Sequence, residues 1–216
     1  MKIVKRFLVS LMATAVSASS LSVIPSVSAA SGKYKTYSYY FDVPANTYVK
    51  TCNANTSYNP NNVEFVRKGK EKFVNSADLG GTFNVSNIGV TDSLKRTYIE
   101  YSNASPTNKE GNLGYVTLKT TSTIPSFSVT LVKNDRGNTL VTSTVKVNRV
   151  LMGDVNLDGI VDVKDVELLN KACMGTASLN KSQLRAADVD GNNQFDSTDS
   201  LNILKYVQGI KDSVCD

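Results

Sequence analysis

Two stretches near the end of the chain carry acidic and amide side chains at the same spacing, and they align without a gap when Asp154 is set against Asp188. Calcium takes about six to eight oxygen ligands, and a loop of about 12 residues delivers them from positions 1, 3, 5, 7, 9 and 12, with a backbone carbonyl at position 7. Both stretches fill every one of these positions, which predicts two Ca²⁺ ions. The expected ligands are Asp154, Asn156, Asp158, Ile160 (carbonyl), Asp162 and Asp165 in the first loop, and Asp188, Asp190, Asn192, Gln194 (carbonyl), Asp196 and Asp199 in the second.

The other loop positions fit the same geometry. Position 6 must turn sharply, normally with a positive φ, and it is Gly159 in one loop and Asn193 in the other, the two residue types that adopt this conformation most easily. Position 8 is apolar in both loops (Val161 and Phe195), as needed to hold a loop on a core. Asn and Asp also favour simple turns, but two in-phase copies favour calcium. Magnesium is disfavoured because it keeps several of its own waters.

A helix is predicted after each loop. No amphipathic helix precedes the first loop, so each site is expected to be a loop followed by a helix, and a further short helix is expected over residues 182–187, capped by Asn180 or Ser182. Apolar residues recur at helical spacing after both loops, and a glycine follows where each helix should end: Val166, Leu169 and Cys173 before Gly175, and Leu201, Leu204 and Val207 before Gly209.

Charge divides the chain into two parts. Residues 31–149 hold 15 basic and 8 acidic side chains, whereas residues 150–216 hold 6 basic and 11 acidic ones. Such asymmetry indicates two modules with different roles. The basic residues of the first part are spread singly, without interleaved aromatics, which is typical of a solvated surface and not of a nucleic-acid site.

The start of the chain, residues 1–30, is expected to be a signal peptide. Lys2, Lys5 and Arg6 form a basic start, residues 7–16 form an apolar core too short to span a bilayer, and a small-x-small pattern ends at Ala29. The alternative is an uncleaved anchor. Cleavage would leave a secreted, extracellular protein, because no second stretch is long and apolar enough for a membrane span.

Residues 31–149 are predicted to form a β-sandwich. Short runs of Tyr, Val, Thr and Phe alternate with Asn, Gly, Pro and Asp turns every eight to twelve residues. The fold class is therefore a mainly β, jelly-roll-like sandwich followed by a small all-α module. The candidate strands are Tyr34–Phe41, Thr47–Cys52, Val63–Arg67, Lys72–Val74, Thr82–Val85, Arg96–Tyr101, Leu113–Thr120, Phe127–Val132 and Leu140–Val147.

Two missing residue types and three cysteines limit the chemistry. The chain has no His, which excludes Ser-His-Asp and Cys-His catalysis and His-containing zinc sites. It has no Trp, so stacking on a sugar would depend on Tyr or Phe. Cys52, Cys173 and Cys215 allow at most one internal bridge, and whether Cys173 and Cys215 form it stays open.

The duplicated loop-helix pattern of residues 150–216 resembles the dockerin family of cellulosome components. The resemblance implies a module that folds on calcium and binds a cohesin domain of a scaffold protein. Family recognition positions fall on Val163 and Lys164 in the first repeat and on Ser197 and Thr198 in the second, and Lys171 and Lys205 occupy matching places further along the helices. Ser197-Thr198 matches the common hydroxyl pair of the family and Val163-Lys164 does not, so single and dual binding modes both stay open.

Two segments of the first part resemble cohesins at superfamily level. They are Tyr58-Asn59-Pro60 followed by Val63-Glu64-Phe65, and Gly114-Tyr115-Val116-Thr117-Leu118-Lys119. Cohesins and several carbohydrate-binding modules share a jelly-roll sandwich, so the resemblance implies this fold without assigning a binding residue.

The expected protein is a non-catalytic component of a cellulosome-like complex in polysaccharide catabolism. Its sandwich would be a second binding module, either a cohesin-like adaptor for other dockerin proteins, which we slightly prefer, or a carbohydrate-binding module. The alternative is a small dockerin-borne glycoside hydrolase. Such an enzyme needs two carboxylates at a defined separation, and Glu64, Glu100, Glu110, Asp78 and Asp92 are available, although none stands in a recognisable motif.

Overall fold

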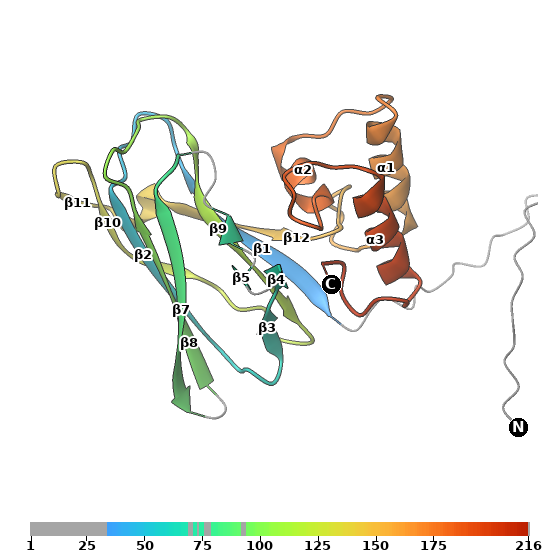
Figure 1. Ribbon diagram of the computed structural model, residues 1–216, viewed down its shortest axis with the longest axis horizontal. Coiled ribbons are helices and arrows are strands. Elements are labelled where there is room, and N and C mark those ends of the chain that lie inside the picture. The colour runs from blue at the N-terminus through green and yellow to red at the C-terminus, as the bar shows by residue number, and fades with distance from the viewer. Residues whose placement is uncertain (1–33, 69–70, 73, 76–78, 92–93, 216) are drawn as a thin grey trace, which may run out of the picture.

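The computed structural model describes residues 34–68, 71–72, 74–75, 79–91 and 94–215. The expected signal peptide, Asp78 and Asp92 lie outside the described residues. The described chain forms a two-sheet sandwich followed by a part with three helices, which lies beside one of the sheets (Figure 1). This confirms the predicted fold class.

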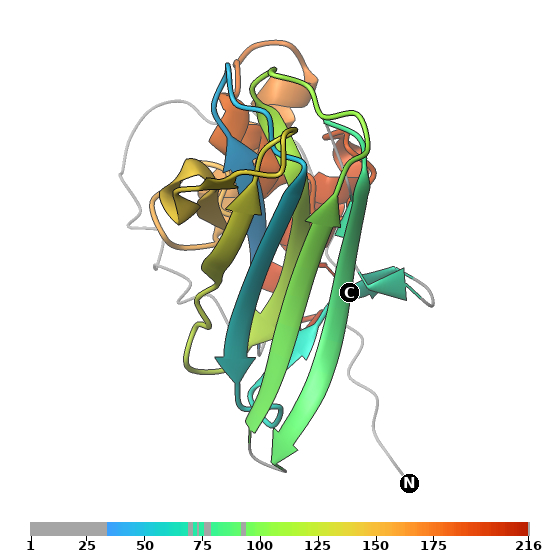
Figure 2. The same ribbon diagram turned by 90° about the vertical axis from the view of Figure 1, so that its left-hand side faces the viewer.

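The first sheet has the strand order β12-β1-β9-β3, with β6 also paired to β9, and the second has the order β11-β10-β2-β8-β7 (Figures 1 and 2). All of the described pairings are antiparallel, and β4 and β5 form a separate hairpin. The strands are β1 (Lys35–Val43), β2 (Thr51–Tyr58), β3 (Val63–Phe65), β4 (Arg67–Lys68), β5 (Glu71–Lys72), β6 (Val74–Asn75), β7 (Thr82–Thr91), β8 (Leu94–Ser102), β9 (Gly111–Thr120), β10 (Ser128–Lys133), β11 (Thr139–Leu140) and β12 (Lys146–Leu151).

The sandwich core lies between the two sheets. Along β2, and along β8 from Thr97 onwards, every second side chain is buried, as expected when one face of an antiparallel sheet packs on a core and the other faces water. Strand β1 departs from this pattern because nearly all of its residues are buried, on both faces. The most deeply buried core side chains include Phe41, Ile99 and Leu118.

Two predicted strands are wrong in position. The strand expected over Thr47–Cys52 instead runs over Thr51–Tyr58, where Asn and Ser on the outer face alternate with buried residues. The strand expected over Leu140–Val147 is interrupted by a 3-10 turn, η1 (Thr142–Thr144), and Val141 is exposed. At this point the chain crosses from the second sheet, which contains β11, to the first, which contains β12, so no neighbouring strand is available to extend the ladder.

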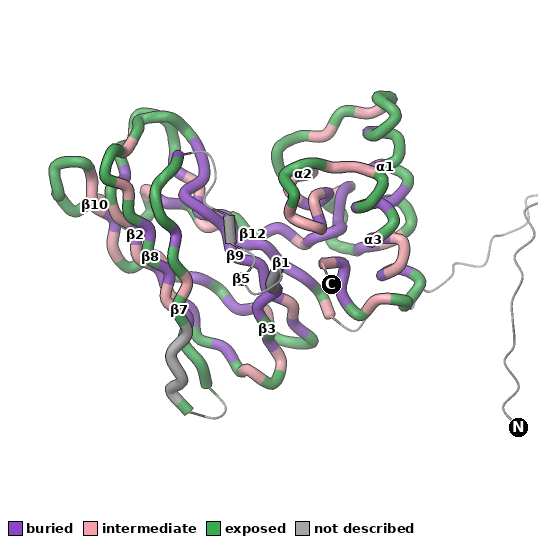
Figure 3. The backbone as a smooth tube through the Cα atoms, viewed as in Figure 1, coloured by how far each residue is buried: buried purple, intermediate pink, exposed green. Residues whose placement is uncertain are grey.

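The C-terminal part consists of α1 (Val163–Cys173), α2 (Lys181–Ala187) and α3 (Ser197–Val207). Helices α1 and α3 pack on each other around the fully buried side chains of Leu169 and Ile203. This part shares one apolar cluster with the outer face of the first sheet, and Figure 3 shows the buried stretch of β1 beside it. In the described part of the chain, no helix is both long and apolar enough to cross a bilayer.

Strand β12 continues past residue 149, where the sequence suggested a boundary between modules. Val150 and Leu151 still pair with β1, opposite Ser38 and Tyr37. Only two residues, Met152 and Gly153, then separate the end of the strand from Asp154, the first expected calcium ligand. The C-terminal part therefore starts directly from the sheet.

Candidate calcium centre and helix surface

The first loop is organised by carboxylates that accept hydrogen bonds from the loop backbone. Asp154 accepts from the N–H groups of Asp158 (3.0 Å) and Gly159 (2.9 Å), one with each carboxylate oxygen. Asp165 accepts from the N–H groups of Asn156 (3.0 Å) and Asp162 (2.8 Å). Two buried carboxylates from opposite ends of the loop thus hold it closed.

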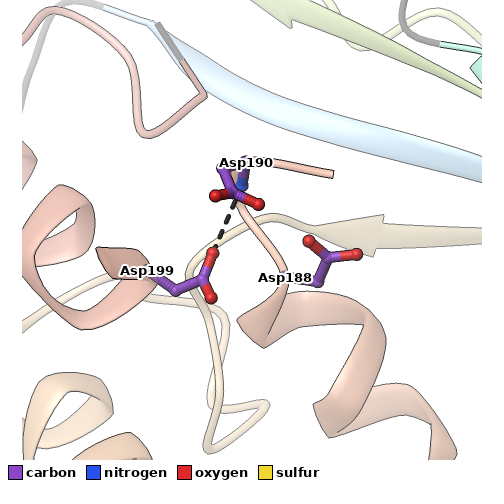
Figure 4. Close-up of side chains that lie close together, drawn as sticks. All are labelled: Asp188, Asp190 and Asp199. Carbon is purple, nitrogen blue, oxygen red and sulfur yellow. Dashed lines mark hydrogen bonds between the residues drawn. The ribbon is translucent and has the colours of Figure 1, made fainter. Parts of the chain in front are cut away.

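The second loop repeats this arrangement. Asp188 accepts from the N–H groups of Asn192 and Asn193, both at 3.0 Å, and Asp199 accepts from those of Asp190 (3.3 Å) and Asp196 (2.9 Å). One carboxylate oxygen from each of Asp188, Asp190 and Asp199 lies within 4.8 Å of the others, and Figure 4 shows the three side chains facing a common space. This donor set of hard oxygens in a tight loop fits calcium.

The expected turn residues adopt the conformation that the spacing predicted. Gly159 has φ 89° and Asn193 has φ 65°, both in the left-handed region. Sequence reasoning missed a second left-handed residue two positions earlier in each loop, where Leu157 has φ 64° and Gly191 has φ 70°. Gly191 alone would have suggested a left-handed residue at this position. Leu157 at the matching position of the first loop did not suggest one, because leucine rarely adopts this conformation.

The remaining expected ligands lie along the same loops. Ile160 and Gln194 donate their N–H groups to the side chains of the position-5 residues Asp158 (2.9 Å) and Asn192 (2.7 Å). The position-9 residues Asp162 and Asp196 are the N-caps of α1 and α3. In both helices the position-12 aspartate completes a capping box by accepting from the N-cap backbone, so the helix start and the expected ion site share side chains.

Burial raises the pKa of the central carboxylates. Desolvation outweighs the backbone hydrogen bonds, and neighbouring acids add to it, so that the pKa of Asp165 and that of Asp188 each rise to about 6. Burial raises the pKa of Asp154 and Asp199 as well. Ionising these neighbouring carboxylates costs free energy because they are buried and repel one another. A divalent cation bound between them would offset this cost and stabilise the charged form.

The start of α2 and the C-terminal ends of α1 and α3 lie where the sequence predicted them. Asn180 caps α2, with its side chain accepting from Ser182 (3.0 Å) and Gln183 (3.1 Å). Gly175 and Gly209 have φ 72° and 67° and follow the last turns of α1 and α3. Each gives the paired backbone hydrogen bonds of a Schellman ending, such as Thr176 to Lys171 at 2.9 Å.

The expected partner-binding residues lie on α1 and α3. Five of them, Val163, Lys164, Lys171, Ser197 and Thr198, are exposed, and Lys205 is half-buried. Lys171 forms an ion pair with Glu167 at 2.7 Å, one turn away, and such exposed pairs contribute little to stability. Met174 and Ile210, which the sequence analysis did not name, and Leu201, which it counted among the apolar helix residues, are also exposed and add apolar area to these helices and their ends.

The three cysteines are not joined to one another in the described chain. Cys52 is buried in the sandwich, Cys173 is exposed at the end of α1, and Cys215 is half-buried near the C-terminus. The Cys173–Cys215 bridge that the sequence left open is absent from this structure.

Comparison with known protein families finds a similarity within the C-terminal part. Residues 152–208 match the family model described as Dockerin type I domain. The matched range holds both loops and all three helices. No curated protein and no solved structure matches the chain.

Proposed function

We propose that the protein is a secreted component of a cellulosome-type polysaccharide-degrading complex, and that residues 150–216 bind a scaffold cohesin when two Ca²⁺ ions occupy the loops. The dockerin match over residues 152–208 carries this proposal, supported by two loops in which the same carboxylate hydrogen bonds recur at equivalent positions. The ligands in each loop are the six named from the spacing, including the carbonyls of Ile160 and Gln194.

The cohesin would bind to α1 and α3. Helix α2 lies towards the sandwich, in contact with β12, whereas α1 lies on the far side (Figure 1). The exposed Val163, Ser197 and Thr198 at the helix starts are therefore available to a partner while the sandwich stays in place. Lys164, Lys171 and Lys205 would meet acidic groups of that partner.

The sandwich is proposed to act as a non-catalytic second binding module. Its first sheet is covered by the C-terminal part, whereas the outer face of the second sheet is open and carries Asn53, Asn55 and Ser57 from β2, and Tyr98 and Glu100 from β8. This face would bind either another dockerin protein or a polysaccharide. The amides, hydroxyls and single ring are suited to hydrogen bonding and to limited stacking.

A hydrolase is less well supported. Glu64 is exposed and lies 3.7 Å from Lys119, and Glu110 is exposed and lies 3.7 Å from Lys181, on a different part of the surface. Glu110 lines a hollow at the junction of the two parts and Glu64 does not, so these two carboxylates do not share a cleft as the acid and base of a glycosidase must.

The full chain without its signal peptide, used as bait against secreted proteins of the source organism, tests the proposal. We expect capture of a cohesin-bearing scaffold in calcium and none in chelator, and loss of capture in Asp154→Ala/Asp188→Ala. Asp135→Asn, which removes an exposed acid of the sandwich outside both loops, is the matched control and should bind normally. Capture that is unchanged in chelator would reject the calcium-dependent mechanism.

The second module needs a separate measurement. Chain retained on insoluble polysaccharide, with retention lost in Tyr98→Ala, would indicate a carbohydrate-binding module. Capture of other dockerin proteins that survives Asp154→Ala/Asp188→Ala would indicate an adaptor. Release of reducing sugar that disappears with a single Glu→Gln change would overturn the non-catalytic assignment.

A further inference from the structure

The outer face of the first sheet is buried beneath the C-terminal part. An antiparallel sheet in a sandwich commonly leaves its outer face to water, but here Ser38 and Tyr40 of β1 and Thr117 and Tyr115 of β9 are all buried on that face. The rings of Tyr40 and Tyr115 stack with centroids 4.8 Å apart. The C-terminal part covers them and shares their apolar cluster.

A single arginine fastens the C-terminal part to this face. Arg185 of α2 donates from both terminal nitrogens to the two carboxylate oxygens of Asp42 on β1, at 2.7 and 2.6 Å. Its guanidinium lies 4.0 Å from the centroid of the Tyr40 ring. Asn148 of β12 donates to the same carboxylate at 2.6 Å. The side chains of Arg185 and Asp42 are only 13% and 16% exposed, so this bidentate pair is largely shielded from solvent.

Further hydrogen bonds join the two parts at the start of β1. The N–H of Tyr34, just before β1, donates to the carbonyl of Asp212 at 2.8 Å, and the hydroxyls of Thr36 and Ser213 lie 3.0 Å apart and buried. Met152 donates to the carbonyl of Thr36 at 2.8 Å. Both ends of the C-terminal part are therefore held at the start of β1.

These ties lie next to the first ligand of each calcium loop. Arg185 is three residues before Asp188, and the two residues between them, Ala186 and Ala187, are fully buried. Gly153, which precedes Asp154, donates to the carbonyl of Ala186 at 2.8 Å. Order in either loop therefore fixes the segment that presents Arg185 to the sheet.

We propose that the outer face of the first sheet is an intramolecular docking surface for the calcium-binding part, with Arg185 and Asp42 as its latch, and that docking and calcium binding strengthen each other. Linkage requires this effect to be reciprocal: if calcium favours the docked state, docking raises calcium affinity by the same factor. The sandwich then senses whether calcium is bound, although it contributes no ligand to the ion.

The junction is open on both sides of the latch. One hollow of about 830 Å³ is lined by Asp42, Arg149 and Leu157, among others, and a second of about 600 Å³ is lined by Tyr40, Leu184 and Phe195, among others. Arg185 lines both hollows. Because hollows flank the latch and the shared apolar cluster stays in place, removal of this one side chain should weaken docking without unfolding either part.

Thermal unfolding of the full chain tests the proposal through two signals. Helix circular dichroism reports the C-terminal part, and the near-ultraviolet tyrosine signal reports mainly the sandwich, which holds nine of the ten tyrosines. In the unaltered chain we expect calcium to raise the midpoint of both signals. In Arg185→Ala, calcium should still raise the helix midpoint but leave the tyrosine midpoint in place, and the calcium Kd should weaken by about fivefold.

Asp42→Asn removes the sandwich side of the same ion pair and should give the same result as Arg185→Ala. The double variant should lose no more coupling than either single variant, because both changes remove the same interaction. The ion pair of Lys181 and Glu110 is the matched control. It also joins α2 to the sandwich, but its side chains are 54% and 68% exposed at 3.7 Å, so Lys181→Gln should leave the coupling intact.

Two results would overturn the proposal. In the first, calcium does not change the unfolding midpoint of the tyrosine signal in the unaltered chain. In the second, calcium raises that midpoint by the same amount in the unaltered chain and in Arg185→Ala. The inference rests on the proposed calcium binding, but the measurement uses no cohesin, so it is independent of which partner the helices bind. An unaltered chain that takes up no calcium by titration calorimetry would instead count against the proposed function.

Discussion

Asp165 accepts a hydrogen bond from the backbone N–H of Asp162 at 2.8 Å, while the carboxylate of Asp162 caps the same helix by accepting from Lys164 at 2.7 Å. Asp196 and Asp199 repeat this relationship in the second loop. The first turn of each helix is thus held by the side chains expected to bind calcium. Calcium binding at these side chains would therefore also order the start of each helix, so that no helix is needed before the loop.

The position-12 aspartates should be important both for calcium and for the closed loop, because both oxygens of Asp199 accept backbone hydrogen bonds. Asn in place of Asp199 keeps one carbonyl oxygen for the backbone but removes a charged ligand oxygen, so calcium affinity at the second loop should fall by about tenfold or more. Titration calorimetry of Asp199→Asn measures this fall. Glu167→Gln removes an equal charge outside the loops and should leave both affinities unchanged, whereas equal losses in the two variants would point to a general charge effect.

Calcium affinity should rise with pH between about 5 and 7. In the calcium-free protein the pKa of Asp165 and of Asp188 is about 6, above the value of about 3.9 expected in an unfolded chain. The folded, calcium-free part therefore holds more protons than the unfolded chain, and it loses stability as pH rises from about 4 through 6. Calcium needs the ionised form and must displace these protons.

Calorimetry in two buffers of different ionisation enthalpy detects the displaced protons. Calcium binding at pH 6 should release them, and binding at pH 8 should release almost none. Urea unfolding in chelator should in parallel show lower stability of the C-terminal part at pH 7 than at pH 5. Proton release that is the same at both pH values would contradict the raised pKa values.

Leu157 holds a conformation that a glycine would adopt more easily. Its φ is 64°, its side chain is 45% exposed, and the matching residue of the second loop is Gly191 with φ 70°. Leu157→Gly should therefore stabilise the calcium-bound protein by about 1 kcal/mol, measured by urea unfolding in excess calcium. Gly191→Leu is the mirror experiment and should destabilise by a similar amount; a loss in both variants would mean that the leucine side chain contributes more than the strain removes.

The cysteines should differ sharply in reactivity. Cys52 is 1% exposed and burial raises its pKa to about 12, whereas Cys173 is exposed. Thiolate is the reacting species, so iodoacetamide at pH 8 should modify Cys173 in the native protein and Cys52 only after unfolding. Peptide mass spectrometry with and without denaturant measures this, and rapid native modification of Cys52 would show that the sandwich opens locally.

Much of the candidate site could be predicted because its chemistry is local. An ion that needs oxygens at fixed intervals imposes a spacing on the sequence, and Gly159, Asn193 and the cap Asn180 follow from backbone conformations that few residue types adopt. The dockerin resemblance and the mainly β first part depend on the same kind of short-range pattern.

The junction between the two parts could not be predicted in this way. Asp42 and Arg185 lie far apart in the sequence, and neither belongs to a motif. The error over Leu140–Val147 has a related cause, because alternating residues there meet no partner strand where the chain crosses between sheets. Pairing partners and packed faces are decided by tertiary structure, which outweighs strand propensity.

The continuity of β12 with the first calcium loop limits how this C-terminal part can be grafted elsewhere. A chimera joined at residue 149 would cut through the ladder between Ser38 and Val150 and would leave the faces of Tyr40 and Tyr115 bare on the donor sandwich. The transplanted segment would also lose the sheet against which its middle helix lies. The unit of exchange in this protein is therefore larger than the segment that the family comparison delimits.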